Sequence, residues 1–149
     1  MTETQTSGTL TVTAKIQISV ERIKDMLCCA IEGGSTYWAE SIDRMGGITR
    51  EQAKYRQDVP FVEDGWLQVI EQEPGMPKDA KTNAERYEDV LDGKKYECYR
   101  LDMAAIEKGL QNFANKYPNA FADLLNENDD AGTGDTFLQC CLFGEAIYG

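Results

Sequence analysis

Residues 136–148 read TFLQCCLFGEAIY, and the burial that this segment requires limits how the chain can fold. Most of its side chains are apolar or are cysteines, so a helix built from it is hydrophobic nearly all round. Helices of that kind are buried in the core of a domain or in an interface between subunits. We therefore expect this C-terminal helix to be buried. We also expect a homo-oligomer that forms through it, because two chains cover such a helix more easily than one.

Two further helices are predicted upstream, from apolar residues at helical spacing. The nearer one follows Asp102, whose side chain can cap a helix, and it ends before Pro118. The farther one follows Ser19, again a favourable N-cap. It stops at Gly33 and Gly34, where we expect the left-handed conformation of a helix C-cap.

Three segments carry the signal of β-strands. Residues 9–18 alternate between apolar and polar side chains and are rich in β-branched residues, which predicts a half-buried strand. Residues 66–71 and 95–101 are the other two predicted strands, whereas residues 79–91 are interpreted as a short surface helix or a long loop. The order of elements predicts an α+β fold, with a small antiparallel sheet and about three helices packed on one face.

The length of 149 residues suits one domain. We expect a flexible N-terminus over residues 1–8 and a single α+β domain over residues 9–149. Within that domain, residues 45–95 carry prolines, glycines and many charges, and we expect this middle part to be rich in loops.

The charge of the chain excludes several functions. The net charge is -11, and residues 102–149 alone hold 8 acidic and 2 basic side chains. Direct binding of nucleic acid needs Lys and Arg against phosphate, so we expect none. The sequence has no histidine, which removes catalytic sites that need imidazole and the commonest nitrogen ligand of transition metals. We therefore predict a protein that is not an enzyme and that has no cofactor.

Five cysteines occur, four of them as the adjacent pairs Cys28–Cys29 and Cys140–Cys141. Neither pair has the C-x-x-C spacing of zinc or redox sites, and both lie in apolar helical patterns. The favoured interpretation is that they are free, buried thiols. A metal site shared between the two pairs is the alternative.

The segment after the first helix offers a candidate site for a ligand or an interface. Its two glycines let another backbone or a ligand approach closely, and its hydroxyl and aromatic side chains could bind and stack on a base. The candidate residues here are Gly33, Gly34, Ser35, Thr36, Tyr37 and Trp38. Arg22, Arg44 and Arg100 would have to offset the phosphates of a bound nucleotide. The alternative is a helix cap followed by aromatic side chains that cover the core.

A second candidate lies just before the last helix, over residues 126–135. It resembles a calcium loop in its alternate Asp and Asn residues, but it lacks the required glycine and the bidentate Glu. Thr133 or Asp135 could instead cap the last helix, or residues 132–134 could hold a phosphate at its N-terminus.

These two segments and the quoted C-terminal stretch resemble a family of small bacteriophage and prophage proteins. The likeness covers residues 27–38 and 101–149 and carries over no catalytic residues. It implies a short, acidic protein made during infection, and small phage proteins of this kind often inhibit host defence. The expected function is therefore a non-enzymatic, phage-type binding protein that counters host antiviral defence.

Two mechanisms fit that function. The protein could occlude a host nuclease such as a CRISPR effector, or it could sequester a nucleotide second messenger in an oligomer pocket. The alternatives are a metal-dependent carboxylate hydrolase and a virion or accessory structural protein. No apolar run approaches the ~18 residues of a membrane span, and no signal-peptide pattern occurs, so we expect no membrane association and a location in the host cytoplasm.

Overall fold

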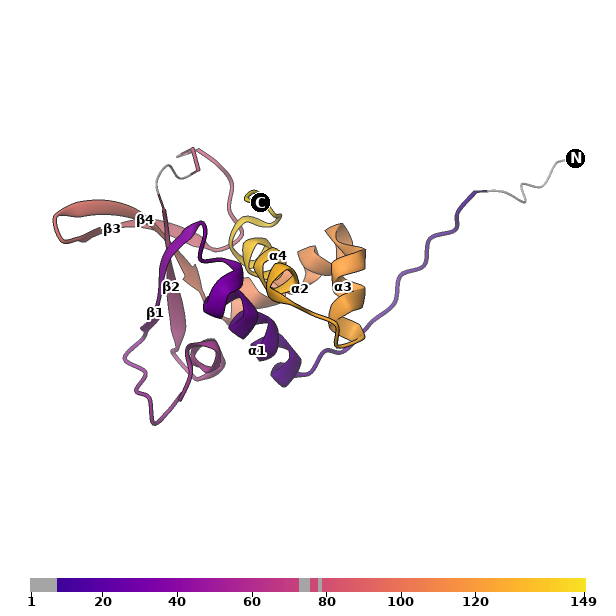
Figure 1. Ribbon diagram of the computed structural model, residues 1–149, viewed down its shortest axis with the longest axis horizontal. Helices are drawn as coiled ribbons and strands as arrows, with labels where there is room; N and C mark the ends of the chain where they lie inside the picture. Colours follow the sequence, from indigo (N-terminus) through magenta and orange to yellow (C-terminus); the bar gives the residue numbers. More distant parts are fainter. Residues whose placement is uncertain (1–7, 73–75, 78) are drawn as a thin grey trace, which may run out of the picture.

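The computed structural model describes residues 8–72, 76–77 and 79–149. Four strands form one antiparallel sheet in the order β1-β2-β4-β3, and the helices cover one of its faces (Figure 1). The strands are β1 (Ala39–Met45), β2 (Trp66–Glu71), β3 (Glu85–Leu91) and β4 (Lys94–Leu101). The helices are α1 (Val20–Cys29), with a π-helical turn η1 (Ala30–Gly34), a 3-10 turn η2 (Arg56–Phe61), α2 (Met103–Lys116), α3 (Pro118–Leu125) and α4 (Ala131–Phe143). The predicted α+β class, with helices on one face of an antiparallel sheet, is confirmed.

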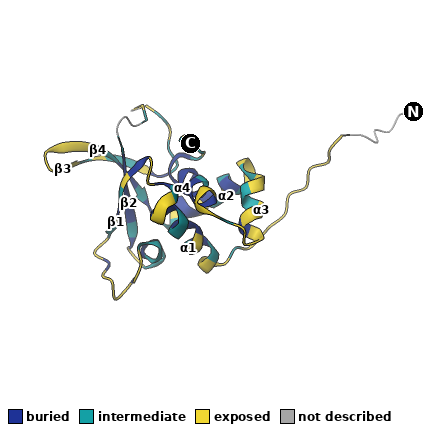
Figure 2. Cartoon of the chain, in the orientation of Figure 1, coloured by how far each residue is buried: buried dark blue, intermediate teal, exposed yellow. Residues whose placement is uncertain are grey.

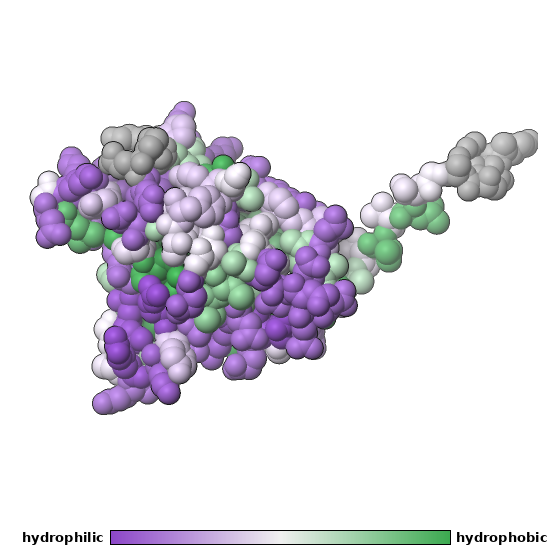
Figure 3. All heavy atoms as spheres, in the orientation of Figure 1, coloured by the Kyte–Doolittle hydropathy of each residue, from purple (hydrophilic) through white to green (hydrophobic). Residues whose placement is uncertain are grey.

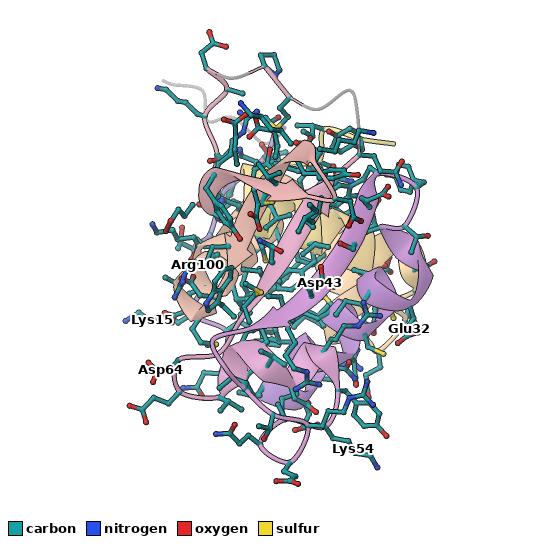
Figure 4. The ribbon with its side chains drawn as sticks, turned by 90° about the vertical axis from the view of Figure 1, so that its left-hand side faces the viewer. Lys15, Glu32, Asp43, Lys54, Asp64 and Arg100 are labelled. Atoms are coloured by element: carbon teal, nitrogen blue, oxygen red, sulfur yellow. The ribbon has the colours of Figure 1, made fainter. Side chains whose placement is uncertain are left out.

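The two faces of the sheet differ in what covers them. On β2, Leu67 and Val69 point into the core beneath the helices, and Gln68 points to the opposite face. The cross-strand partners of Gln68 are Asp43 and Arg100. Both appear on the helix-free face of the sheet in Figure 4, which looks onto that face.

Helix α4 lies at the centre of the helical layer. It packs against α1 on one side and α2 on the other, and Figure 2 shows α4 dark along most of its length, after an exposed first turn. The predicted burial of the apolar C-terminal stretch is confirmed, and the burial occurs within one chain. An oligomer is therefore not needed to cover α4, although the oligomer itself stays a prediction.

Glycines make the crossings of α4 possible. A Cβ on Gly34 would overlap the carbonyl oxygen of Ala131, and a Cβ on Gly134 would lie 2.6 Å from the carbonyl oxygen of Met26. On the other side of α4, a Cβ on Gly109 would overlap Cys141 Sγ and lie 2.5 Å from its Cα. Each crossing is thus a close approach of two backbones, which only glycine permits.

The helix boundaries follow local capping, with one correction. Ser19 and Asp102 cap α1 and α2 as predicted. Helix α4 begins at Ala131, five residues before the predicted start, because the side chain of Asp130 accepts the amide of Thr133 at 2.9 Å. Neither Thr133 nor Asp135 is the N-cap, so that prediction is wrong.

Gly33 and Gly34 end the first helix where predicted, but not through a left-handed cap. The φ of Gly33 is 172°, which is extended backbone. Gly34 is needed for its close approach to α4 instead, as described above.

The strands are partly as predicted. Strand β2 is confirmed at residues 66–71, and β4 begins one residue before its predicted start. Strand β1 was not predicted, and neither a helix nor a long loop occupies residues 85–91, which form β3. Asp92 and Gly93, both with positive φ, turn β3 into β4 as a two-residue hairpin does.

Residues 9–18 are extended but form no strand, so the prediction of a half-buried strand is wrong. This segment, which we call the N-terminal arm, leaves the body at α1 and runs away from the sheet (Figure 1). Its period-two pattern makes it suited to a sheet, but none of the described strands lies beside it. Residues 1–7 of the predicted flexible N-terminus lie outside the described residues.

We predict that Gly109→Ala lowers the free energy of unfolding by about 2 kcal/mol or more, because the new methyl group overpacks the α2–α4 crossing. Gly132→Ala, in the first turn of α4, is the matched control, since its Cβ meets only Asp130 Oδ1, at 3.3 Å. Urea denaturation of both variants measures the difference. Equal stabilities of the two variants would contradict the role of Gly109.

Candidate functional site

The two candidate segments meet at the carboxylate of Asp135. Ser35 Oγ and Trp38 Nε1 donate to Asp135 Oδ1 at 2.8 and 2.7 Å. Tyr37 OH and Gln139 Nε2 donate to Oδ2 at 2.7 and 3.1 Å. We call these five residues the Asp135 cluster. The aspartate is 9% exposed, so its charge is held in the protein interior by four neutral donors.

Gln139 links this cluster to the segment that follows α4. Its Oε1 accepts the amides of Ile147 and Tyr148 at 2.7 and 2.8 Å. The ring of Tyr148 then stacks on Trp38, with centroids 5.2 Å apart and planes 5° apart. The face of Trp38 that could have stacked on a ligand is therefore covered by Tyr148 in this structure.

A second buried carboxylate lies on the other side of that stack. Glu71, at the end of β2, accepts the hydroxyl of Tyr99 at 2.8 Å and the hydroxyl of Tyr148. The amide of Met76 also donates to Glu71, at 3.3 Å. Tyr148 thus connects the two carboxylates, with its ring on Trp38 and its hydroxyl on Glu71.

The tyrosines of this network are held in the protonated form. Burial, followed by the hydrogen bond to Asp135, raises the pKa of Tyr37 to about 12. Burial and then Glu71 raise the pKa of Tyr99 and of Tyr148 above the ordinary range. These phenols act as hydrogen-bond donors at neutral pH and are poor general bases. This network of phenols and carboxylates is therefore suited to stabilising the fold.

The phosphate site expected at the N-terminus of α4 is occupied by the chain itself. Asp130 Oδ1 accepts both the amide and the hydroxyl of Thr133, at 2.9 and 3.1 Å. These hydrogen bonds, the backbone one first, lower the pKa of Asp130. A carboxylate in this position would repel a phosphate. Thr36 is exposed and donates to Gly33 O, at 2.9 Å.

The three candidate arginines do not converge on the cluster. Arg22 pairs with Asp129 and with Asp25. Arg44 donates to three backbone carbonyls of residues 49–54. Arg100 pairs with Asp102 at 3.1 Å and lies 4.5 Å from the ring centroid of Trp66. In the register of the sheet, Arg44 lies opposite the core-facing Leu67, whereas Arg100 lies opposite Gln68, which points to the other face. The side chains of Arg44 and Arg100 are therefore on different faces of the sheet.

The cysteines are free thiols, as expected, and Cys98, Cys140 and Cys141 are buried. Cys28 and Cys29 are only half-buried, so the expected burial is wrong for that pair. Burial raises the pKa of Cys98 to about 11 and of Cys140 to about 12, which suppresses the thiolate that reacts with electrophiles. Within the described residues, no three Cys, Asp or Glu side chains come together in a way that could hold a metal ion.

Two hollows of the described surface lie away from the Asp135 cluster. One, of about 480 Å³, is between α1 and η2 and includes Lys24, Asp58 and Phe61. The other, of about 400 Å³, is beside the start of α2 and includes Arg100 and Asp102. Both mix acidic and basic groups, so neither has the excess of positive charge that a nucleotide would require.

The sequence interpretation missed Glu71, Tyr99, Gln139 and Tyr148. A signal for two of them is present in the sequence. Glu71 continues the alternation of the core-facing Leu67 and Val69, so it occupies a core position of an apolar strand. Gln139 is one helical turn from Asp135 in an otherwise apolar helix, and buried polar residues at that spacing bond to each other.

We predict that Asp135→Ala lowers the free energy of unfolding by about 3 kcal/mol or more, because it leaves several buried donors without an acceptor. Asp135→Asn should cost less, since its amide oxygen can still accept from Ser35 and Trp38. Asp123→Asn, at an exposed position of α3, is the surface control. Chemical denaturation compares the variants. An Asp135→Ala variant as stable as Asp123→Asn would show that the Asp135 cluster does not stabilise the fold.

Because the pKa of Tyr37 is raised in the folded chain, we predict a loss of stability at alkaline pH. Its pKa is about 12 in the folded chain and 10.0 ordinarily, so the unfolded chain loses this proton first as the pH rises. The stabilisation is complete below pH 10 and disappears as the pH approaches 12. Tyr37→Phe should flatten the decline of the melting temperature across this window. A decline as steep as in the unaltered chain would contradict the prediction.

Of the described residues, no helix combines the length and the apolar character that crossing a bilayer requires. Comparisons of the chain with profiles of known protein families, with curated proteins and with solved structures find no match. Function must therefore be inferred from the contacts and charges of the chain.

Proposed function

We propose that this chain is a non-enzymatic binding protein that counters a host antiviral defence by occluding the basic nucleic-acid channel of a host nuclease, such as a CRISPR effector. The observation that carries the proposal is a group of carboxylates around α1 and the loop before α4. We call this group the α1 acidic surface; it consists of Asp25, Glu32, Glu127, Asp129 and Asp130.

These carboxylates act together on the groups among them. After burial, the largest influences that raise the pKa of Cys28 are Glu32 and Asp25, and for Cys29 they include Asp129 and Asp130. Arg22 offsets part of this charge through its pairs with Asp25 and Asp129, and Arg56 opposes the effect of the carboxylates on Cys28. The surface therefore keeps an excess of negative charge, which attracts a basic partner and speeds its association.

The contacts of the site favour occlusion over capture of a nucleotide. Trp38 is 2% exposed and stacked on Tyr148. The hydroxyl of Tyr37 is engaged by Asp135. The arginines that would have neutralised phosphates are bound elsewhere in the chain. Groups that are already satisfied within the fold offer little to a small ligand. Glu32 and Glu127 are exposed and have no ion pair among the described side chains, so they remain free to contact another protein.

The resemblance of the sequence to small phage proteins supplies the biological setting of this proposal. In that setting the protein acts in the cytoplasm of the infected cell. Exposed acidic side chains spread over a surface resemble the charge of a nucleic-acid backbone, and a nuclease channel is built to attract such charge.

The test is inhibition of DNA cleavage by a purified RNA-guided host nuclease at low and high salt. We expect inhibition that weakens at least about tenfold between 50 and 200 mM salt, because screening shortens the range of the attraction. Asp25→Lys combined with Glu127→Lys should abolish it, since both side chains are exposed on the α1 acidic surface.

The matched control is Glu40→Lys combined with Glu51→Lys, which changes the net charge equally at exposed positions of β1 and the following loop. This variant should keep most of the inhibition. Equal loss of inhibition in both variants would show that inhibition depends on the net charge of the protein and not on the α1 acidic surface. No inhibition at low salt by the unaltered protein, across nucleases of several types, would overturn the proposed function.

A further inference from the structure

The N-terminal arm, residues 9–18, is extended and has the side-chain pattern of a strand, but it belongs to no sheet. Leu10, Val12 and Ile16 are 101%, 87% and 53% exposed, although they alternate with polar residues as in a half-buried strand. In the part of the chain that the structure describes, the backbone of residues 9–17 forms no hydrogen bond. Figure 3 shows the apolar residues of this arm as green spheres standing clear of the body. Such a segment gains both hydrogen bonds and apolar burial by adding to the edge of a sheet.

The sheet has two edges, β1 and β3, and they are not equally available. At the β1 edge, Arg56 Nη1 already donates to the carbonyl of Ile42, at 2.9 Å. At the β3 edge, the two-residue turn sets Leu91 and Lys94 as a hydrogen-bonded pair, so the backbone groups of Glu88 and Val90 point away from β4. The amide of Val90 donates only to the side chain of its own neighbour Asp89, at 2.9 Å, a local bond that an added strand can replace. The β3–β4 hairpin projects beyond the helical layer (Figure 1), which leaves this edge accessible.

Strand β3 also carries an unbalanced charge. Glu88 lies directly opposite Glu97, a like-charge pair that destabilises a sheet. Arg86 pairs with Glu97 at 3.1 Å. Among the described side chains, Glu88 has no ion-pair partner. The edge therefore has a position where an added cation would be stabilising.

We propose that the N-terminal arm of one copy adds as a strand to the free edge of β3 in a second copy, and that two copies exchange arms reciprocally. One of the two possible orientations of the arm's faces satisfies both the apolar pattern of the arm and the charge of β3. The apolar side chains of the arm then lie on the face of Tyr87 and Leu91, and Lys15, on the opposite face of the arm, lies beside Glu88. Lys15 is the only charged residue between Gly8 and Ser19, so the arm brings its one cation to the one unpaired carboxylate on that face of β3.

The direction of the arm favours binding to the sheet of a second copy over binding to its own sheet. The arm leaves α1 on the side away from the sheet (Figure 1) and would have to reverse its course to reach its own β3. Reciprocal exchange also follows the usual two-fold symmetry of dimers, in which each chain gives and receives the same element.

The first test measures mass by light scattering on the full-length chain. We expect twice the 16.7 kDa of one chain. Lys15→Glu alone and Glu88→Lys alone should each raise the dimer dissociation constant about tenfold or more, because each variant places like charges together at both contacts. An equimolar mixture of the two variants should dimerise again, since every Lys then meets a Glu.

The second test addresses the backbone and the apolar face. Amides of residues 10–17 should be protected from hydrogen exchange at concentrations where the dimer forms, and unprotected on dilution. Val12→Ser combined with Ile16→Ser should abolish the dimer, whereas Thr11→Ser combined with Thr13→Ser, on the opposite face, should leave it intact.

Three outcomes would overturn the proposal. A monomer with an unprotected arm would leave the arm to a different protein. A monomer with a protected arm would place it on its own sheet. A dimer indifferent to the Lys15 and Glu88 reversals would form through another surface. Because none of these readouts uses a nuclease, the result is independent of the proposed function.

Discussion

The buried carboxylate of Asp135 joins α4 to the segment that follows α1. It accepts hydrogen bonds from Ser35, Tyr37, Trp38 and Gln139. Among the described residues it has no ion-pair partner. A buried charge that is stabilised only by neutral donors requires all of them in place. The close backbone approaches at Gly34 and Gly134 bring α1 and α4 near enough for these bonds, so packing and polar satisfaction depend on each other.

Local signals in the sequence determined some elements of the fold correctly. Ser19 and Asp102 act on the next few residues only, so their capping role can be predicted without knowing the fold. Strand β1 could not be found in the same way. A bulge between Ala39 and Ser41 places the buried Ala39 and Ile42 three residues apart, which breaks the period-two pattern. Strand β3 is mostly exposed and charged, so it carries no apolar signal.

Four of the five members of the Asp135 cluster were predicted from the sequence, whereas Gln139 and the arrangement of the cluster were not. Ser35, Tyr37, Trp38 and Asp135 stand out as polar or aromatic residues in unusual surroundings. Their contact joins positions about 100 residues apart, and no pattern within one sequence specifies such a pairing. The stacking role expected of Trp38 is fulfilled by Tyr148 of the same chain, because a buried aromatic side chain packs on whatever apolar surface the fold provides.

The central position of α4 also sets the order in which the chain can fold. Helix α1 and residues 35–38 leave the ribosome long before Asp135 does. At usual rates of synthesis, the roughly 100 residues between them take on the order of 5–20 s to translate. During that time the apolar side of α1, including Met26 and Leu27, has no α4 to cover it. Apolar surface that is exposed during folding is prone to aggregation, and chaperones exist to protect it, so this chain has such a surface until α4 emerges.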